Sequence, residues 1–286
     1  MQRPRLYLML AFHNNSDAPN PVVAEVITIL KRKGFQIEIG FAESLLLQPE
    51  ALSAKHDLYI LKSHTSLWLS LAGVLHFQGA EILNPYLACL ATMNKIMTAS
   101  RLHSAGVPIP RSWVTGDLQL LLSLAAERQL IMKPYDGRRG NGIRIVNEPR
   151  ELASIPAPRR PVLVQEYIAG GDELKVYVIG DEVFAMRRPP STNACPGPRA
   201  ACAVSPKVRR IALRCGQVFG LGLYGLDMVE GPDGPVVVDL NYFPSYRGVP
   251  GAATLIADYI EEYAKEDCPR LAVNQFAQGA ASQGAA

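Results

Sequence analysis

The sequence lacks any uninterrupted apolar run of about 18 residues, the length that a membrane-spanning helix requires. Its first apolar run, at 5–12, is also read as too short for a membrane span or for the core of a signal peptide. We therefore expect a protein that has no membrane partner.

Paired cysteines are lacking as well. The five cysteines are scattered and include no CxxC pair, so neither a disulfide framework nor a zinc site is indicated. This pattern suits a reducing compartment, and we expect a cytoplasmic protein. The cysteines are Cys89, Cys195, Cys202, Cys215 and Cys268.

A strong charge of either sign is also missing. The formal net charge of +3 and the pI of about 8.6 are too mild for a dedicated nucleic-acid binder, so no nucleic-acid partner is expected. The same small excess suits a cleft that holds anionic nucleotides or metabolites. With 286 residues, 48% of them hydrophobic, the chain can bury the core of one large domain or of two to three small ones.

About the first ninety residues show short apolar runs separated by helical signals, which is typical of α/β structure with a parallel sheet. Asn20 can cap a helix that has Pro21 at its first position, and Gly34 can end this helix. A second helical stretch is predicted from Asn84 to Gly106. The apolar runs are 5–12, 35–40, 58–62 and 81–84.

Strand signals dominate beyond residue 130, and they predict a mixed sheet. Gly180-Asp181 is expected to form a tight hairpin turn. The segment 189–206 is rich in Pro, Ser, Cys and Ala and is expected to be a loop. The tail 266–286 is expected to be disordered.

One hairpin carries the most informative acidic residues. Its strands flank a turn at 231–234, and a symmetric pairing about Asp233 sets Asp227 directly opposite Asp239. Like charges that face each other across a ladder are destabilising, whereas Mg²⁺ binds oxygen ligands, and Asn241 points to the same side. These side chains predict a magnesium site. The alternative is an exposed hairpin whose acids are simply solvated.

A glycine-rich turn follows Lys133, which lies in the apolar strand LIMKP. A strand and not a helix follows the glycines, which excludes a Walker-type loop but permits a flap whose backbone N–H groups cover phosphates. The alternative is a flexible turn, for which glycine is the usual residue. The flap residues are Gly137, Arg138, Arg139, Gly140, Asn141 and Gly142.

Two further segments carry candidate ligands. Gln165–Ile168 ends an apolar strand before a glycine pair, where backbone groups could pair with an adenine edge. Lys175, Arg187 and Arg188 lie on the next two strands, where alternation puts some of them on one face with Glu173. The alternative for these basic residues is that they are solvated charges at a sheet edge.

Taken in order, Lys95, IMKP with its glycine loop, VQEYI, ELKVYVIG, YGLDMVE and VVDLNYFPSYRGVPG resemble the ATP-grasp superfamily across about residues 84–260. The resemblance implies an ATP-grasp fold of class α/β (α+β), with a Rossmann-like domain before the ATP-grasp unit. The implied division is an N-terminal domain at 1–88, a central subdomain with the glycine loop at 89–168, a C-terminal subdomain with the metal site at 169–265, and the tail at 266–286.

The same resemblance implies a role in Mg-ATP chemistry for each candidate residue. Lys95 and Lys133 would contact the phosphates beneath the glycine loop, while Lys175 and Arg188 would act as catalytic residues at the transferring phosphoryl group. The cofactors would be ATP and two Mg²⁺ ions, which Mn²⁺ could replace. The other implied ligands are Gln165, Glu166, Tyr167 and Ile168 for adenine, Glu173 for ribose, and Asp227, Asp239 and Asn241 for the metal.

Two subgroups of the superfamily match in different places. RimK-type amino-acid ligases resemble the N-terminal α/β layout, the GRRGNGI loop and the GDEVFAMRR strand pair, whereas inositol polyphosphate kinases resemble ELKVYVIG and DLNYFPSYRGV. We favour a carboxylate-amine ligase that forms an acyl phosphate on a small-molecule or peptide acceptor. The alternatives are an inositol polyphosphate kinase with a phosphate-bearing acceptor and a nucleotide-binding protein without turnover. Assembly into a homodimer is left open.

The kinase alternative makes a prediction of its own, because arginine forks suit phosphate and a multiply phosphorylated ring needs a basic lining. The residues of this lining would be Lys62, Arg138, Arg139, Lys175, Arg187, Arg188 and Arg247.

Overall fold

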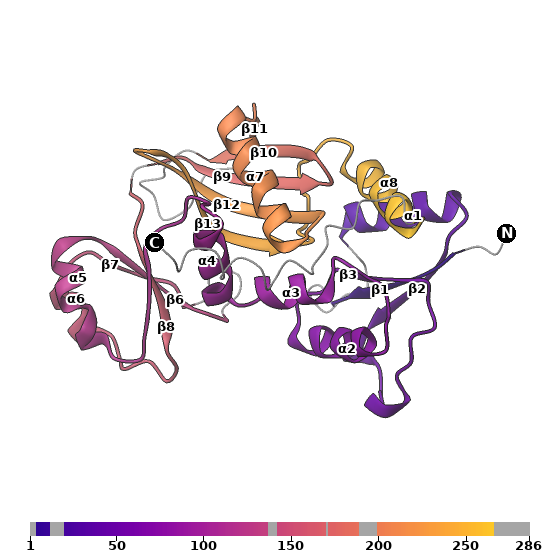
Figure 1. The fold of residues 1–286 in the computed structure, drawn as a ribbon, viewed down its shortest axis with the longest axis horizontal. Helices are drawn as coiled ribbons and strands as arrows, with labels where there is room; N and C mark the ends of the chain where they lie inside the picture. Colours follow the sequence, from indigo (N-terminus) through magenta and orange to yellow (C-terminus); the bar gives the residue numbers. More distant parts are fainter. Residues whose placement is uncertain (1–3, 12–19, 137–141, 170, 189–198, 266–286) are drawn as a thin grey trace, which may run out of the picture.

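The computed structural model describes residues 4–11, 20–136, 142–169, 171–188 and 199–265. Within these ranges the chain forms three sheets, with helices packed on them and between them (Figure 1). The predicted α/β (α+β) class is confirmed. No helix in the described ranges is both long and apolar enough to cross a membrane. The predicted disordered tail, 266–286, lies outside the described residues.

The N-terminal sheet is parallel throughout and has the strand order β2-β1-β3-β4. All residues of β3 (Leu58–Leu61) are buried, as expected of a parallel strand with helices on both sides. The predicted alternation of strands and helices is confirmed. The other elements are β1 (Arg5–Leu10), α1 (Pro21–Arg32), β2 (Gln36–Phe41), η1 (Ala42–Ser44), η2 (Pro49–Ala51), α2 (Ser66–Phe77) and β4 (Ile82–Leu83).

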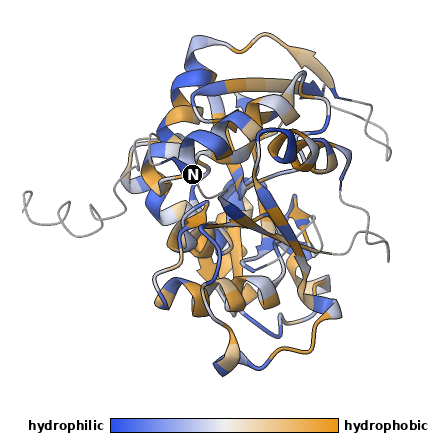
Figure 2. Cartoon of the chain, turned by 90° about the vertical axis from the view of Figure 1, so that its right-hand side faces the viewer, coloured by the Kyte–Doolittle hydropathy of each residue, from blue (hydrophilic) through white to orange (hydrophobic). Residues whose placement is uncertain are grey.

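Helix α1 begins where the sequence predicts. The Asn20 side chain accepts a hydrogen bond from Val22 N at 2.9 Å, and Pro21 is the first helical residue. Gly34 follows the helix with a φ of +95°, which glycine adopts without strain. The helices in Figure 2 carry both hydrophilic and hydrophobic segments, as expected when one side faces a core.

The second helical stretch is divided in two by Asn94. This residue caps the second helix, where its Oδ1 accepts hydrogen bonds from Ile96 N and Met97 N at 3.0 and 3.2 Å. The prediction of one largely helical stretch is correct in extent but missed this break. The two helices are α3 (Tyr86–Thr92) and α4 (Lys95–Ser104).

The central sheet is antiparallel, with the strand order β5-β8-β6-β7. It packs with short helices around an apolar cluster of its own, apart from the larger core. Its elements are β5 (Ser112–Thr115), η3 (Leu118–Leu121), α5 (Leu122–Glu127), β6 (Leu130–Pro134), β7 (Arg144–Val146), α6 (Pro149–Ser154) and β8 (Val162–Glu166).

The C-terminal sheet is antiparallel, with the order β11-β10-β9-β12-β13, and the predicted turn at Gly180-Asp181 joins β9 to β10. The expectation of a loop throughout 189–206 was wrong. Residues 189–198 lie outside the described residues, but β11 (Ala200–Cys202) pairs with the otherwise free edge of β10. The other elements are β9 (Glu173–Ile179), β10 (Glu182–Arg188), α7 (Pro206–Phe219), β12 (Leu223–Gly231), β13 (Gly234–Tyr242) and α8 (Ala252–Ala264).

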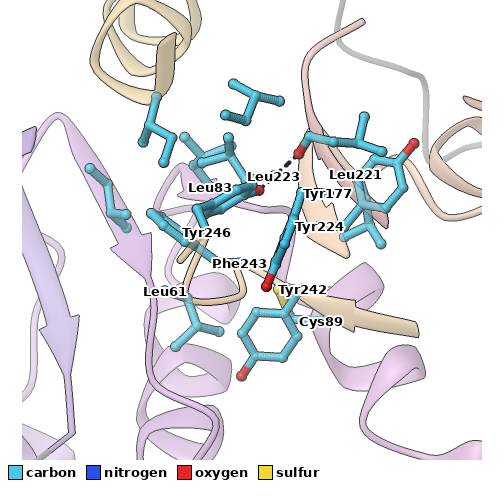
Figure 3. Packing of buried hydrophobic residues seen from close by; sticks show 14 of the residues in the cluster. Leu61, Leu83, Cys89, Tyr177, Leu221, Leu223, Tyr224, Tyr242, Phe243 and Tyr246 are labelled. Carbon is cyan, nitrogen blue, oxygen red and sulfur yellow. Dashed lines mark hydrogen bonds between the residues drawn. The ribbon is translucent and has the colours of Figure 1, made fainter. Parts of the chain in front are cut away.

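The N-terminal and C-terminal sheets share one apolar core. Figure 3 shows Leu61 and Leu83, from the N-terminal strands, in the same packed group as Tyr242 and Phe243. Helix α8 lies beside α1 (Figure 1), and Lys33, just after α1, forms a salt bridge with Asp258 on α8 at 2.7 Å. The division at 1–88, 89–168 and 169–265 stays a prediction.

Asn84 fixes the junction between these two sheets. It is fully buried; its Nδ2 donates to Leu223 O at 2.7 Å, and its Oδ1 accepts from Gly222 N and Leu223 N, both at 3.0 Å. Asn84→Ala removes the acceptor of two buried backbone N–H groups, those of Gly222 and Leu223, so we expect the free energy of unfolding to fall by about 3 kcal/mol. Urea denaturation measures this loss. Asn147→Ala removes an exposed amide and should cost less than about 0.5 kcal/mol; equal losses would contradict the prediction.

Candidate active site

One face of the C-terminal sheet gathers the predicted metal ligands. Asp227 on β12 lies directly opposite Asp239 on β13 and directly opposite Lys175 on β9, so the three side chains form a row across three strands. Asn241 and Glu173 lie two residues along their strands from members of this row and therefore point to the same side. The structure thus brings together residues that are far apart in the sequence.

The hairpin reaches this alignment by a route that the sequence did not predict. Gly231 pairs with Gly234, so the turn comprises the two residues between them. This register alone would place Asp227 opposite Val238. The pairing changes after Asp227, where Val238 forms a bulge that restores the alignment with Asp239. The symmetric pairing about Asp233 was therefore wrong as geometry, although the predicted partners are the ones observed.

Each carboxylate has a lysine beside it. Lys95 Nζ lies 2.6 Å from Asp239 Oδ1, and Lys175 Nζ lies 2.9 Å from Asp227 Oδ2. Asn241 Nδ2 donates to Asp239 Oδ2 at 3.4 Å. The lysines balance two like charges that would otherwise repel each other across the ladder. The side chains of Asp227 and Asp239 remain 34% and 29% exposed, so ions and ligands can reach them.

Lys133 reaches the same place from the central sheet. It is buried, and its Nζ donates to Gln165 Oε1 at 2.9 Å and to Val238 O at 3.3 Å. Desolvation is the main cause of its lowered pKa; Asp239 opposes this shift and Lys95 adds to it. The two predicted phosphate-binding lysines, from α4 and β6, therefore converge beside one carboxylate.

The predicted adenine hinge, Gln165–Ile168, comprises the last two residues of β8 and the two residues after it. Glu166 N donates to Arg111 O at 3.0 Å, and Tyr167 N donates to Gln129 O at 2.9 Å. These two backbone donors are occupied by the residues that directly precede β5 and β6. The adenine roles of this segment stay predictions.

The two arginines of β10 point to opposite faces of the sheet. Arg188 lies opposite Glu173 on the face of the acidic row and bonds to it at 3.2 Å. Arg187 lies on the other face, 2.6 Å from Asp172 and 2.8 Å from Glu230. The hydrogen bond to Asp172 is the main cause of the raised pKa of Arg187. Arg187 is thus neutralised away from the site, and its predicted place in a basic lining was wrong.

The glycine flap is described only at its end. Gly142 has a φ of +77°, and a Cβ there would lie 2.9 Å from Cγ of Pro134, so this position requires glycine. The remaining flap residues lie outside the described residues; they are Gly137, Arg138, Arg139, Gly140 and Asn141.

Sequence reasoning missed the loop that follows β3. His64 Nε2 donates to Tyr242 O at 2.6 Å, across a sequence separation of 178 residues. Tyr242 OH donates in turn to Ser63 O at 2.6 Å. No local pattern could have revealed these contacts, because they depend on how two sheets pack. They place the loop beside the strand that carries Asn241.

The donor set fits a magnesium ion. Two carboxylates face each other with an amide side chain on the same side, and hard cations of this kind bind oxygen ligands. Within the described ranges, no cluster of three His, Cys, Asp or Glu side chains has the arrangement of a metal site. The predicted site differs from such a cluster because Asn241 supplies its third oxygen.

A comparison with known protein families identifies the family of this chain. Residues 92–260 match the family model of the RimK-like ATP-grasp domain. The chain belongs to the RimK-like ATP-grasp family. A curated relative, a probable alpha-L-glutamate ligase of Hahella chejuensis, is 30% identical over 216 residues, which cover 67% of this chain and 70% of that protein.

Solved structures share the fold of this chain. The RimK-domain ATP-grasp protein of Sphaerobacter thermophilus has a TM-score of 0.74 and 22% identity to this RimK-like chain, covering 89% of it and 98% of its own length. The ATP-grasp ligase PsnB, solved with a minimal precursor, Mg and ADP, has a TM-score of 0.65 and 22% identity, covering 90% and 96%.

The predicted ATP-grasp fold and RimK-type membership are confirmed, and this RimK-like chain is an ATP-grasp ligase. The roles of individual site residues, the number of metal ions and the use of Mn²⁺ stay predictions.

Proposed function

We propose that this RimK-like ligase joins the amino group of L-glutamate to a carboxylate of a peptide or small-molecule acceptor, converting ATP to ADP and phosphate. The observation that carries the proposal is the convergence of Lys95, Lys133 and Lys175 on the facing pair Asp227 and Asp239. The name of the Hahella chejuensis relative supports glutamate as the amine, and the precursor bound to PsnB supports a peptide as one kind of acceptor.

The proposed reaction has two steps. An oxygen of the acceptor carboxylate attacks the γ-phosphorus of ATP, ADP leaves, and an acyl phosphate forms. The amine then attacks the acyl carbon, phosphate leaves, and the nitrogen loses a proton. Both steps bring anionic groups together, so the protein's main task is to hold them in line and to neutralise their charge.

The lysines have a second set of partners in this proposal. Asp227, Asp239 and Asn241 would hold magnesium, for which we propose two ions that Mn²⁺ can replace. Magnesium would supply positive charge to the phosphates and hold them in line for transfer. Lys95 and Lys175 would then be released from the carboxylates toward the phosphate oxygens. Lys133, held by Gln165 and Val238, would stay in place throughout.

Hydroxylamine trapping tests the ligase reaction. With ATP, Mg²⁺ and candidate acids, including L-glutamate and a peptide that ends in glutamate, hydroxylamine should intercept the acyl phosphate and give a hydroxamate. Hydroxamate and ADP should appear in equal amounts. ADP production with a polyol phosphate, but no hydroxamate with any acid, would instead support the inositol phosphate kinase alternative. Nucleotide binding without any ADP release would support the alternative without turnover.

A further inference from the structure

Lys62 places a cation where the N-terminal sheet meets the strand of the metal site. It directly follows β3, and its backbone N–H donates to Met9 O at 3.2 Å, which fixes it at the carboxyl edge of the parallel sheet. Open α/β sheets bind ligands at this edge. Lys62 Nζ lies 5.3 Å from the ring centroid of Phe243, the second residue after Asn241.

The surroundings hold this cation in place. Phe243 N donates to Leu223 O at 2.7 Å, and Phe243 has a φ of +31°, a strained conformation for any residue other than glycine. The contacts of Ser63 and His64 with Tyr242 fix the loop on the other side. Figure 3 shows the rings of Tyr242 and Phe243 within the shared core. The ring beneath Lys62 is therefore positioned by the core itself.

Lys62 differs from the other lysines at this junction in its electrostatic surroundings. Lys95 and Lys175 each form a salt bridge with a carboxylate, whereas no carboxylate in the described part of the chain forms one with Lys62. Desolvation by the surrounding protein lowers the pKa of Lys62 to about 8, although the side chain keeps partial contact with solvent. The cation–π contact compensates for only part of the lost hydration. A fixed cation of this kind favours an anionic ligand.

We propose that Lys62 binds a carboxylate of the amino acid that supplies the amine, an inference that rests on the proposed function. The phosphates and the reacting carboxylate already have Lys95, Lys133 and Lys175 on the acidic face. Lys62 lies beyond Asn241, on the side of the N-terminal sheet. Glutamate keeps both carboxylates charged while its nitrogen reacts, so a cation for one of them stabilises binding throughout the reaction. Such an interaction acts mainly on KM.

A comparison of two amines tests the inference. Hydroxylamine carries no carboxylate and therefore cannot use the proposed interaction with Lys62. Lys62→Met should lower kcat/KM for glutamate at least tenfold more than it lowers kcat/KM for hydroxylamine. A loss of this size is expected when a charge-assisted hydrogen bond is removed. Lys62→Gln, which keeps a polar side chain, should give the same selectivity change if Lys62→Met folds poorly. Lys31→Met removes an exposed lysine of α1 and should leave the ratio unchanged.

Changes in the substrate give an independent measurement. L-glutamine and isoglutamine each replace one carboxylate of glutamate by an amide. For the wild-type enzyme, one of these two analogues should have a kcat/KM that is lower than that of glutamate by a similar factor. For Lys62→Met, the same analogue should have a kcat/KM no lower than that of glutamate, because the interaction between Lys62 and the carboxylate is already lost. The inference would be overturned if Lys62→Met and Lys62→Gln lowered kcat/KM equally for glutamate and for hydroxylamine, or if neither variant lowered it. A wild-type enzyme that makes neither hydroxamate nor glutamate product would overturn the proposed function itself.

Discussion

Replacing Asp239 with alanine is expected to lower ATP turnover on the order of 10³-fold, because a metal ion and its ligands supply several kcal/mol of transition-state stabilisation. Asp239 faces Asp227 across the hairpin, accepts a hydrogen bond from Lys95 at 2.6 Å and has Asn241 beside it. The substitution therefore removes the centre of the proposed magnesium site. ADP release measured over a range of Mg²⁺ concentrations is the test.

Asp233→Ala is the matched control for this prediction. Asp233 lies in the turn of the same hairpin, where it is exposed, and its backbone carbonyl accepts a hydrogen bond from Lys207. Its side chain can be removed without touching the acidic face, so we expect turnover to change less than about twofold. Equal activity in Asp239→Ala and wild type would exclude a metal site at this hairpin. Loss of activity in both variants would indicate damage to the hairpin instead.

Lys133→Met is expected to lower kcat/KM for ATP by about 10³-fold. Lys133 is held rigidly by Gln165 and Val238, so its ammonium group is already positioned for phosphate, and such preorganised groups contribute most to stabilising transferred charge. Methionine has a similar size but no charge. The variant loses two hydrogen bonds, which destabilises the fold, but it no longer has to desolvate an ammonium group, which stabilises it. We therefore expect a small change in melting temperature, below about 5 °C.

Lys55→Met provides the comparison, because Lys55 is an exposed lysine of the N-terminal region. Initial rates at varied ATP concentration, with melting curves of both variants, separate a defect in catalysis from a defect in folding. If Lys133→Met kept wild-type kcat/KM for ATP, Lys133 would have a structural role only. The inverse pattern, a folded variant without activity, is the expected one.

Local signals in the sequence were sufficient for most of the fold. Apolar runs and caps such as Asn20 predicted the N-terminal sheet and helix α1, because strand burial and helix capping depend on neighbours in the chain. The break at Asn94 was missed because apolar periodicity continues across it. Strand β11 was missed because its three residues carry no strand pattern and are ordered by pairing with β10.

The candidate site was predictable in its members but not in its geometry. Pairing of Asp227 with Asp239 was predicted from a symmetric turn, whereas the structure combines a two-residue turn with a bulge at Val238. A bulge has little sequence signature, since any residue can occupy it when tertiary contacts require it. Arg187 and Arg188 point to opposite faces because they are adjacent in one strand, but which of them shares the face of the acidic row depends on the strand register. The position of Lys62 beside Phe243 depends on the packing of two sheets.

The contact between α1 and α8 has a consequence for how the protein is made. Lys33 bonds to Glu261 across 228 residues, and Tyr263 OH donates to Glu81 Oε1 at 3.0 Å. During synthesis the ribosome completes the N-terminal sheet long before it produces α8. The nascent chain must therefore carry an uncovered α1 surface until almost all of the described chain has emerged. Translation order and folding order are thus opposed at this contact: helix α1 is synthesised long before α8 but is fully packed only after α8 has emerged.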